Sequence, residues 1–319
     1  MRLTKTQRYL RISHSLREVR FKLGNYKLFG KDGESTRNIV VFRIDPRVYA
    51  GGMCDRFKGM ICAYAWAKAN GYSFRIIHND PYRLSDYIKP AIVDWIPKEG
   101  EISTSARGTK LFLNRSEKGE RFLKYKPDGR QLHYYGNLNF LDKINAKYGT
   151  NYKWGELYKE LFVPCEELQA LVSCLTPSGE YVSASFRFQK LLGDFDEKYH
   201  SSLNTVEERQ ALMDACLDAI RKIKEDNPGM SVLVTSDSTT FIEEASKIEG
   251  VFTVPGKRVH IQYDTTAQAD EYMTCFLDFY LLTGSQKLYR VCKGKMYKTG
   301  FPVTAAMVND RPLIDMILD

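Results

Sequence analysis

Strand-like and helix-like runs alternate in two separate regions of this chain, and this alternation constrains the fold more than any other feature. In the first region Ile39–Ile44 has the apolar, β-branched pattern of a buried parallel strand, and Gly51-Gly52 marks a tight turn. Apolar residues then recur at helical spacing until Asn70-Gly71, and Phe74–Ile77 is the next strand-like run. Strand, glycine turn, helix and strand form a βαβ unit, which predicts a parallel sheet.

A second alternating region begins near residue 180. Its strand-like runs are Tyr181–Phe188, Val232–Thr235, Val251–Val254 and Lys287–Cys292. Thr205 with Glu208 forms a capping box that begins one helix-like run, and Thr240 with Glu243 caps a shorter one. The other helix-like runs are Glu271–Leu282 and Val303–Val308. Between the two regions only Lys110–Leu113 and Gln131–Tyr135 resemble strands. We therefore expect an α/β protein with a basic segment at 1–30, a Rossmann-like domain at 31–170 and a second one at 171–319, facing each other across a cleft.

The composition narrows the class of protein further. Hydrophobic residues make up 43% and charged residues 27% of the 319 residues, which is typical of a globular chain. No apolar run is long enough to cross a bilayer, and the N-terminus lacks a signal-peptide core, so we expect a cytoplasmic protein. The seven cysteines form no CxxC pair and the five histidines are scattered, so no metal site is expected.

The net charge of +8 leaves several partners open: nucleic acid, an anionic membrane surface or a phosphorylated substrate. No RNP, zinc-finger or helix-turn-helix signature supports nucleic acid. Residues 1–30 concentrate basic side chains between apolar ones, with Glu18 as the single acid. This segment fits either a helix that packs on the body of the protein or a peripheral contact with an anionic membrane.

Candidate site residues follow from the rule that ligands bind beyond the carboxyl ends of parallel strands. Arg187 lies near the end of the strand at 181–188, and Ser236, Asp237 and Ser238 directly follow the strand at 232–235. Thr299, Gly300 and Phe301 lie at the start of the final helix-like run. A guanidinium, a carboxylate and a helix N-terminus on one rim suit a nucleotide diphosphate. Taken singly, each also fits a surface ion pair or an ordinary helix cap.

Two further groups of residues complete the candidate set. In the first region Gly51, Gly52, Cys54 and Asp55 form the strand-to-helix turn, which is neither GxGxxG nor a Walker A loop. In the second region Asp194 or Glu197 could deprotonate an acceptor hydroxyl as a general base, and a solvated acidic loop is the alternative. The string Asp194-Phe195-Asp196 mimics a metal-binding DxD, although its context does not favour a metal.

Four strings in order along the chain carry a resemblance to a known family. They are GGMCDRFKGMICAYAWAKANGYSFRI, SFRFQKLLGDF, VLVTSDSTTF and YKTGFPVTAAMVN, and together they span about residues 39–310. The chain resembles the GDP-fucose-dependent fucosyltransferase superfamily, which includes protein O-fucosyltransferases, α1,6-fucosyltransferases and nodulation fucosyltransferases. The resemblance implies a GT-B fold and inverting transfer of L-fucose from GDP-β-L-fucose without a metal. We expect a glycan hydroxyl as acceptor, and a lipid-linked glycan if the basic segment at 1–30 contacts a membrane.

The same resemblance implies a role for each matching residue. Arg187 would contact the β-phosphate, Asp237 the nucleoside, Thr299 to Phe301 the phosphates, and Gly52 to Asp55 the donor. The chain departs from the family pattern at five residues. Ser185 stands where the family has histidine, Cys54 replaces a glycine and Asp55 an asparagine, and two serines become Thr299 and Gly300. Two alternatives therefore stay open, a catalytically inactive sugar-nucleotide-binding relative and a nucleic-acid-binding protein.

Overall fold

The computed structural model describes residues 16, 19–28, 30, 38–45, 51–114, 120–194, 203, 205–256 and 268–319. The chain divides into two compact units, Met1–Val163 and Pro164–Asp319. The division lies earlier than the expected boundary between residues 170 and 171. The reason is that α6 (Glu166–Leu175) packs against α9 (Ala269–Gly284) and so belongs to the second unit.

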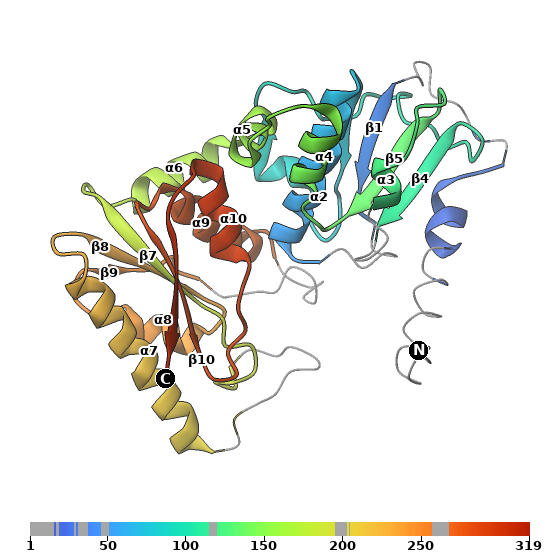
Figure 1. The fold of residues 1–319 in the computed structure, drawn as a ribbon. Helices are drawn as coiled ribbons and strands as arrows, with labels where there is room; N and C mark the ends of the chain where they lie inside the picture. The colour runs from blue at the N-terminus through green and yellow to red at the C-terminus, as the bar shows by residue number, and fades with distance from the viewer. Residues whose placement is uncertain are drawn as a thin grey trace. The chain divides into compact units, whose positions relative to one another are not determined.

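The first unit is built on a four-stranded parallel sheet in the order β2-β1-β5-β4. Its strands are β1 (Ile39–Arg43), β2 (Ser73–Ile77), β4 (Thr109–Asn114) and β5 (Gln131–Gly136). Helix α2 (Met53–Ala69) packs on β1 and β5, and α4 (Leu141–Tyr148) and α5 (Trp154–Leu161) pack on α2 (Figure 1). The short elements are η1 (Leu84–Asp86), α3 (Glu120–Leu123), and β3 (Ile88–Pro90), which pairs with β6 (Phe162–Pro164).

Two glycines allow α2 to start and to lie where it does. Gly51 has φ +69°, a left-handed conformation that glycine adopts without strain, and the chain turns there into the helix. Gly59 lies where α2 passes the end of β5, because a Cβ on this residue would come within 1.7 Å of the Gly136 carbonyl oxygen. Helix and strand therefore approach more closely than any residue with a side chain would permit.

The second unit is built on a five-stranded parallel sheet in the order β11-β10-β7-β8-β9. Its strands are β7 (Tyr181–Phe186), β8 (Ser231–Ser236), β9 (Val251–Phe252), β10 (Leu288–Lys293) and β11 (Leu313–Leu318). Helices α7 (Val206–Glu225) and α8 (Thr239–Ala245) cover one face, and α9 and α10 (Phe301–Asn309) cover the other (Figure 1). The core on the α7 side contains alternate residues of β7, such as Val182, Ala184 and Phe186.

These two parallel sheets confirm the α/β class and the Rossmann-like layering predicted from the alternation. Several elements differ from the prediction. The strand predicted at 181–188 ends at Phe186, the final helix is followed by the edge strand β11, and α4, α5 and α6 were not predicted. The edge strand was missed because half-exposed residues such as Ile314 and Ile317 do not show the continuous apolar pattern of a buried strand.

The described part of the N-terminal segment packs on the first unit. Residues 19–25 are helical, Phe21 is fully buried, and the Tyr26 hydroxyl lies 2.6 Å from Nδ1 of His133. Lys27 pairs with the backbone at Thr104, to which its N–H donates at 2.8 Å. Of the two alternatives for residues 1–30, packing is thus observed for residues 19–28, while residues 1–15 lie outside the described part. No helix among the described residues is long and apolar enough to cross a membrane.

Candidate functional site

The three predicted rim segments of the second unit lie side by side at the carboxyl ends of its strands. The segment after β7 meets the segment after β8, because the backbone N–H of Phe188 donates to Oδ1 of Asp237 at 2.9 Å. The loop before α10 joins them, because the N–H of Tyr297 donates to the carbonyl oxygen of Arg187 at 3.1 Å. The structure thus brings Arg187, Asp237 and the turn at Thr299 to one edge of the sheet, where α/β proteins bind ligands.

Arg187 and Asp237 form an ion pair at this edge. One terminal nitrogen of the guanidinium lies 3.2 Å from Oδ2 of Asp237, and the side chains are 17% and 3% exposed. The same carboxylate accepts the N–H groups of Phe188 and of Gln189, the latter at 2.8 Å. Burial raises the pKa of Asp237, while the Arg187 charge and the two N–H groups act in the opposite direction. The carboxylate is therefore enclosed by protein donors, and the guanidinium is the more accessible partner.

The residues around this ion pair have local structural contacts. Ser185 is buried, and its hydroxyl lies 2.8 Å from that of Thr235 on the neighbouring strand. Ser238, rather than Thr240 as predicted, caps α8, because its Oγ accepts the N–H of Phe241. Thr240 was predicted because it has an acid, Glu243, three residues on, which is the sequence pattern of a capping box. That pattern does not show which of the neighbouring hydroxyls lies at the first turn of the helix.

The same turn explains where Ser236 and Asp194 lie. Ser236 Oγ accepts the N–H of Ser238 at 3.1 Å. Asp194 Oδ2 accepts from the Ser238 hydroxyl at 2.8 Å and from the N–H of Thr240 at 2.9 Å. Asp194 thus places a negative charge at the N-terminus of α8, where the helix dipole favours it. Glu197, the other predicted general base, lies outside the described residues, as do Phe195 and Asp196.

The turn before α10 is held by an arginine that the sequence analysis missed. Arg290 on β10 makes two hydrogen bonds to Asp315, at 2.7 and 2.9 Å, and a third to the carbonyl oxygen of Thr299 at 3.1 Å. The Thr299 hydroxyl accepts the N–H of Phe301 at 3.2 Å, and Gly300 is the N-cap residue of α10. This arginine was detectable only from its strand register, because Arg290 pairs with Asp315 across β10 and β11.

In the first unit the glycine turn lies at the carboxyl end of β1, as predicted. Cys54 is buried in the first turn of α2, and Asp55 pairs with Lys58 at 3.1 Å. Arg56 fixes this turn, because its buried guanidinium donates to the carbonyl oxygens of Gly51 (3.1 Å) and Asp80 (3.0 Å).

The same guanidinium lies 3.0 Å from Nε2 of His78, just after β2. Because arginine only donates, Nε2 of His78 accepts, and Nδ1 carries the hydrogen that it donates to the carbonyl oxygen of Tyr82 at 3.1 Å. Burial first, and then the Arg56 charge, lower the pKa of His78 well below its usual range. Neither Arg56, in the first turn of α2, nor His78, which directly follows the predicted strand at 74–77, was predicted as a site residue.

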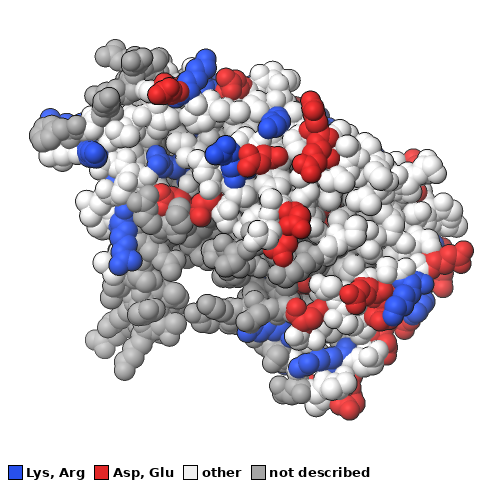
Figure 2. Space-filling model, turned by 180° about the vertical axis from the view of Figure 1, so that it is seen from behind, with Lys and Arg blue, Asp and Glu red and all other residues white. Residues whose placement is uncertain are grey.

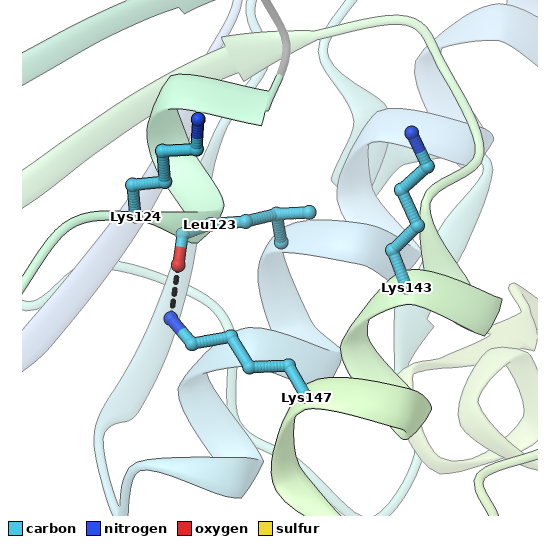
Figure 3. A pocket seen from close by; sticks show the side chains of 4 residues that line it. All are labelled: Leu123, Lys124, Lys143 and Lys147. Carbon is cyan, nitrogen blue, oxygen red and sulfur yellow. Dashed lines mark hydrogen bonds between the residues drawn. The ribbon is translucent and has the colours of Figure 1, made fainter.

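A hollow of about 560 Å³ in the first unit is lined by Leu123, Lys124, Lys143 and Lys147, and the Lys147 amine donates to the carbonyl oxygen of Leu123 (Figure 3). None of the predicted site residues lines it. Among the residues that the structure describes, no group of three or more His, Cys, Asp or Glu side chains could hold a metal ion. On the face shown in Figure 2 basic and acidic side chains are interspersed, unlike the continuous basic surface of nucleic-acid-binding proteins.

Comparison with solved structures identifies proteins that share this fold. The fucosyltransferase NodZ from Bradyrhizobium is 14% identical over 84% of this chain and 92% of its own, with a TM-score of 0.55. A variant of Arabidopsis thaliana FUT1 in complex with GDP is 14% identical over 96% of this chain and 78% of its own, with a TM-score of 0.58. The chain has the fold of these fucosyltransferases.

This fucosyltransferase fold covers both units, since the aligned parts take in most of the chain. It agrees with the GT-B fold that the sequence resemblance implied. A NodZ α-1,6-fucosyltransferase soaked with GDP-fucose matches equally well, at 13% identity over 85% of this chain and 92% of its own with a TM-score of 0.55. No family profile matches the sequence, and no curated protein matches it by sequence. Identity this low establishes the fold and leaves function to the site.

Proposed function

We propose that this protein is an inverting glycosyltransferase that transfers L-fucose from GDP-fucose to a hydroxyl group of a glycan. The observation that carries the proposal is the position of Arg187, partly exposed at the carboxyl edge of the second sheet and hydrogen-bonded through its carbonyl oxygen to the loop before α10. The proposal is also supported by two fucosyltransferases that share the fold, NodZ and FUT1. Their structures were determined with GDP-fucose and with GDP, respectively.

The proposed reaction is a single displacement at the anomeric carbon. The acceptor oxygen forms a bond to this carbon while the bond from the carbon to the β-phosphate oxygen breaks, and the acceptor proton passes to a general base. Negative charge develops on the leaving diphosphate. The guanidinium of Arg187 and the positive end of the α10 helix dipole would stabilise that charge more strongly in the transition state than in the bound donor. Because Arg187 supplies positive charge at the phosphates, we propose that the reaction needs no metal ion.

The acceptor side of the proposal is a glycan or a lipid-linked glycan. It includes a peripheral contact between residues 1–30 and an anionic membrane. Three apolar side chains, Leu16, Val19 and Leu23, are 56%, 51% and 77% exposed in the described part of this segment, beside the exposed Arg20 and Lys22. An exposed apolar stripe with adjacent basic side chains is typical of helices that lie on lipid surfaces. All seven cysteines are free thiols, which supports a reducing compartment and hence the cytoplasm as its location.

The decisive test of the donor is a thermal-shift panel with GDP, UDP and CMP, each with and without EDTA. GDP at about 100 times its dissociation constant is expected to raise the free energy of unfolding of the protein by about 2.7 kcal/mol. EDTA should leave this rise unchanged. A rise with UDP or CMP and none with GDP would overturn the assignment of the donor.

One observation favours the alternative of an inactive relative that only binds sugar nucleotides. The hydroxyl of Ser185, which stands where the resembling family has histidine, is bonded to Thr235 inside the sheet and is 2% exposed. Hydrolysis of GDP-fucose separates the two functions. An enzyme releases free fucose slowly in the absence of acceptor, whereas an inactive relative binds GDP and leaves GDP-fucose intact.

A further inference from the structure

The carboxylate of Asp237 is surrounded by donors from one short segment after β7. Oδ1 accepts the N–H of Phe188 at 2.9 Å, and Oδ2 accepts the N–H of Gln189 at 2.8 Å. Oδ2 also lies 3.2 Å from a terminal nitrogen of Arg187. Three successive residues, 187 to 189, therefore direct donors at a single side chain that follows the neighbouring strand β8.

The backbone of the same segment is held in an uncommon conformation. Gln189 has φ +56°, a left-handed value that costs a residue with a Cβ on the order of 1 kcal/mol. Such a conformation persists only when the surrounding contacts enforce it. The hydrogen bond from the N–H of Gln189 to Asp237 is one such contact, and Gln189 itself is 8% exposed.

We propose that Asp237 is a positioning residue that orients the guanidinium of Arg187 toward the diphosphate of the donor, and that it does not contact the nucleoside. This inference rests on the proposed function, and it replaces the nucleoside contact that the sequence resemblance implied. A side chain that is 3% exposed and accepts three donors from its own protein has little surface left to offer a base or a ribose. The guanidinium beside it is 17% exposed and is therefore the more accessible member of the ion pair.

Orientation matters here because arginine has many rotamers. A guanidinium that is already fixed when the donor binds loses less conformational entropy and needs no reorganisation as charge develops on the leaving group. The carbonyl oxygen of Arg187 is tied as well, since it accepts the N–H of Tyr297 from the loop before α10. Backbone and side chain of Arg187 are thus both anchored by the two neighbouring rim segments.

The test compares GDP with GMP, because only GDP carries the β-phosphate that departs with the nucleotide. Dissociation constants are measured by calorimetry for the wild-type protein, Asp237→Asn, Arg187→Met and the double variant. If Asp237 positions Arg187, Asp237→Asn weakens GDP binding about 10-fold or more and leaves GMP binding nearly unchanged. In the Arg187→Met background the same substitution then has no further effect on GDP, because residues that act as a unit are not additive.

Asn227→Ala serves as the matched control for general loss of stability. Asn227 is also buried, and its amide donates to the Ile223 carbonyl and the Tyr289 hydroxyl, but it lies before β8, at the opposite edge of the sheet. This variant should lower the melting temperature and keep the wild-type ratio of GDP to GMP affinity.

Three outcomes overturn the inference. Equal losses of GDP and GMP affinity in Asp237→Asn would place Asp237 at the nucleoside. Unchanged affinity for GDP in that variant, or a full additional loss in the Arg187→Met background, would show that Asp237 does not act through Arg187. If the wild-type protein binds neither nucleotide, the proposed function fails and the inference fails with it, whereas the first three results leave the proposed function standing.

Discussion

Acidification is expected to destabilise the first unit through His133, which is fully buried on β5. The side-chain amide of Gln131 fixes its tautomer. Oε1 of Gln131 accepts the N–H of Ser103 at 2.9 Å, so it must also accept from Nε2 of His133, which lies 3.0 Å away. Nδ1 then accepts from the hydroxyl of Tyr26, 2.6 Å away. Both ring nitrogens are therefore satisfied in the neutral state.

The sign and size of the effect follow from the pKa of His133. Burial first, and then the Arg43 charge, lower this pKa from its ordinary 6.5 to about 3. Because the folded pKa lies below the unfolded one, the unfolded chain takes up the proton first as the pH falls, and stability is lost from about pH 6.5 downward. At about 1.4 kcal/mol per pH unit, a change from pH 7 to pH 5 costs about 2 kcal/mol. His78, whose pKa is also lowered, adds a loss of the same sign.

The assay is urea unfolding at pH 7, 6 and 5, followed by tryptophan fluorescence. All three tryptophans, Trp66, Trp95 and Trp154, belong to the first unit, so their emission reports the unfolding of that unit alone. The control is His133→Gln, which keeps a donor near Gln131 and cannot titrate. It should be less stable than the wild type at pH 7, since the Tyr26 hydroxyl loses its acceptor.

The deciding quantity is the free energy of unfolding that is lost between pH 7 and pH 5, compared between the wild type and His133→Gln. The wild type should lose about 2 kcal/mol more than His133→Gln over this interval. If the two proteins show the same dependence on pH, His133 is not a buried neutral group, and the hydrogen-bond scheme derived for it is wrong.

Three further predictions concern the site and the fold. Arg187→Ala should lower the rate of sugar transfer about 100-fold or more. Arg187→Lys should also transfer sugar slowly, because an ammonium lacks the planar pair of N–H donors of a guanidinium. Near-normal turnover of folded Arg187→Ala would remove this residue from the mechanism. If the turn at Thr299 binds the phosphates as proposed, Arg290→Leu should weaken GDP binding about 10-fold in calorimetry, since the Thr299 carbonyl loses its donor and a positive charge beside this turn is lost. Wild-type affinity would restrict Arg290 to its contact with Asp315 on β11. Gly59→Ala should destabilise the first unit by about 3 kcal/mol or more in fluorescence-detected unfolding, because its Cβ would meet the Gly136 oxygen; a stability equal to that of the wild type would contradict the close approach.

The strands and helices with strong periodic patterns were predictable from the sequence. The turn at Gly51, the strands at β1 and β8 and the capping box of α7 at Thr205 and Glu208 all lie where the sequence analysis placed them. These features depend on local propensity and on the burial of one continuous run. Helices such as α4 and β-strands such as β11 depend on which face of a neighbour they cover, and that information is not local in the sequence.

Candidate site residues were predictable by position, because polar side chains that follow parallel strands collect at one edge of the sheet. Ser236 and Ser238 do lie there, but their hydroxyls accept backbone N–H groups of their own turn and of α8. A serine after a strand is equally suited to a phosphate and to a helix N-terminus, since both require the same hydrogen-bonding group. The residue type alone therefore could not separate a binding role from a capping role.

Arg187 and Asp237 show why the role of a charged residue requires the tertiary structure. The family resemblance assigned each to a different part of the same ligand, Arg187 to the β-phosphate and Asp237 to the nucleoside. In the structure the carboxylate faces the N–H groups of residues 188 and 189, which precede it by 49 and 48 positions in the chain. Burying a carboxylate is favourable only where donors surround it, so its partners had to come from the neighbouring strand end. The charge that remains accessible is the guanidinium, and the chemistry of the rim therefore depends on the residue that holds it in place.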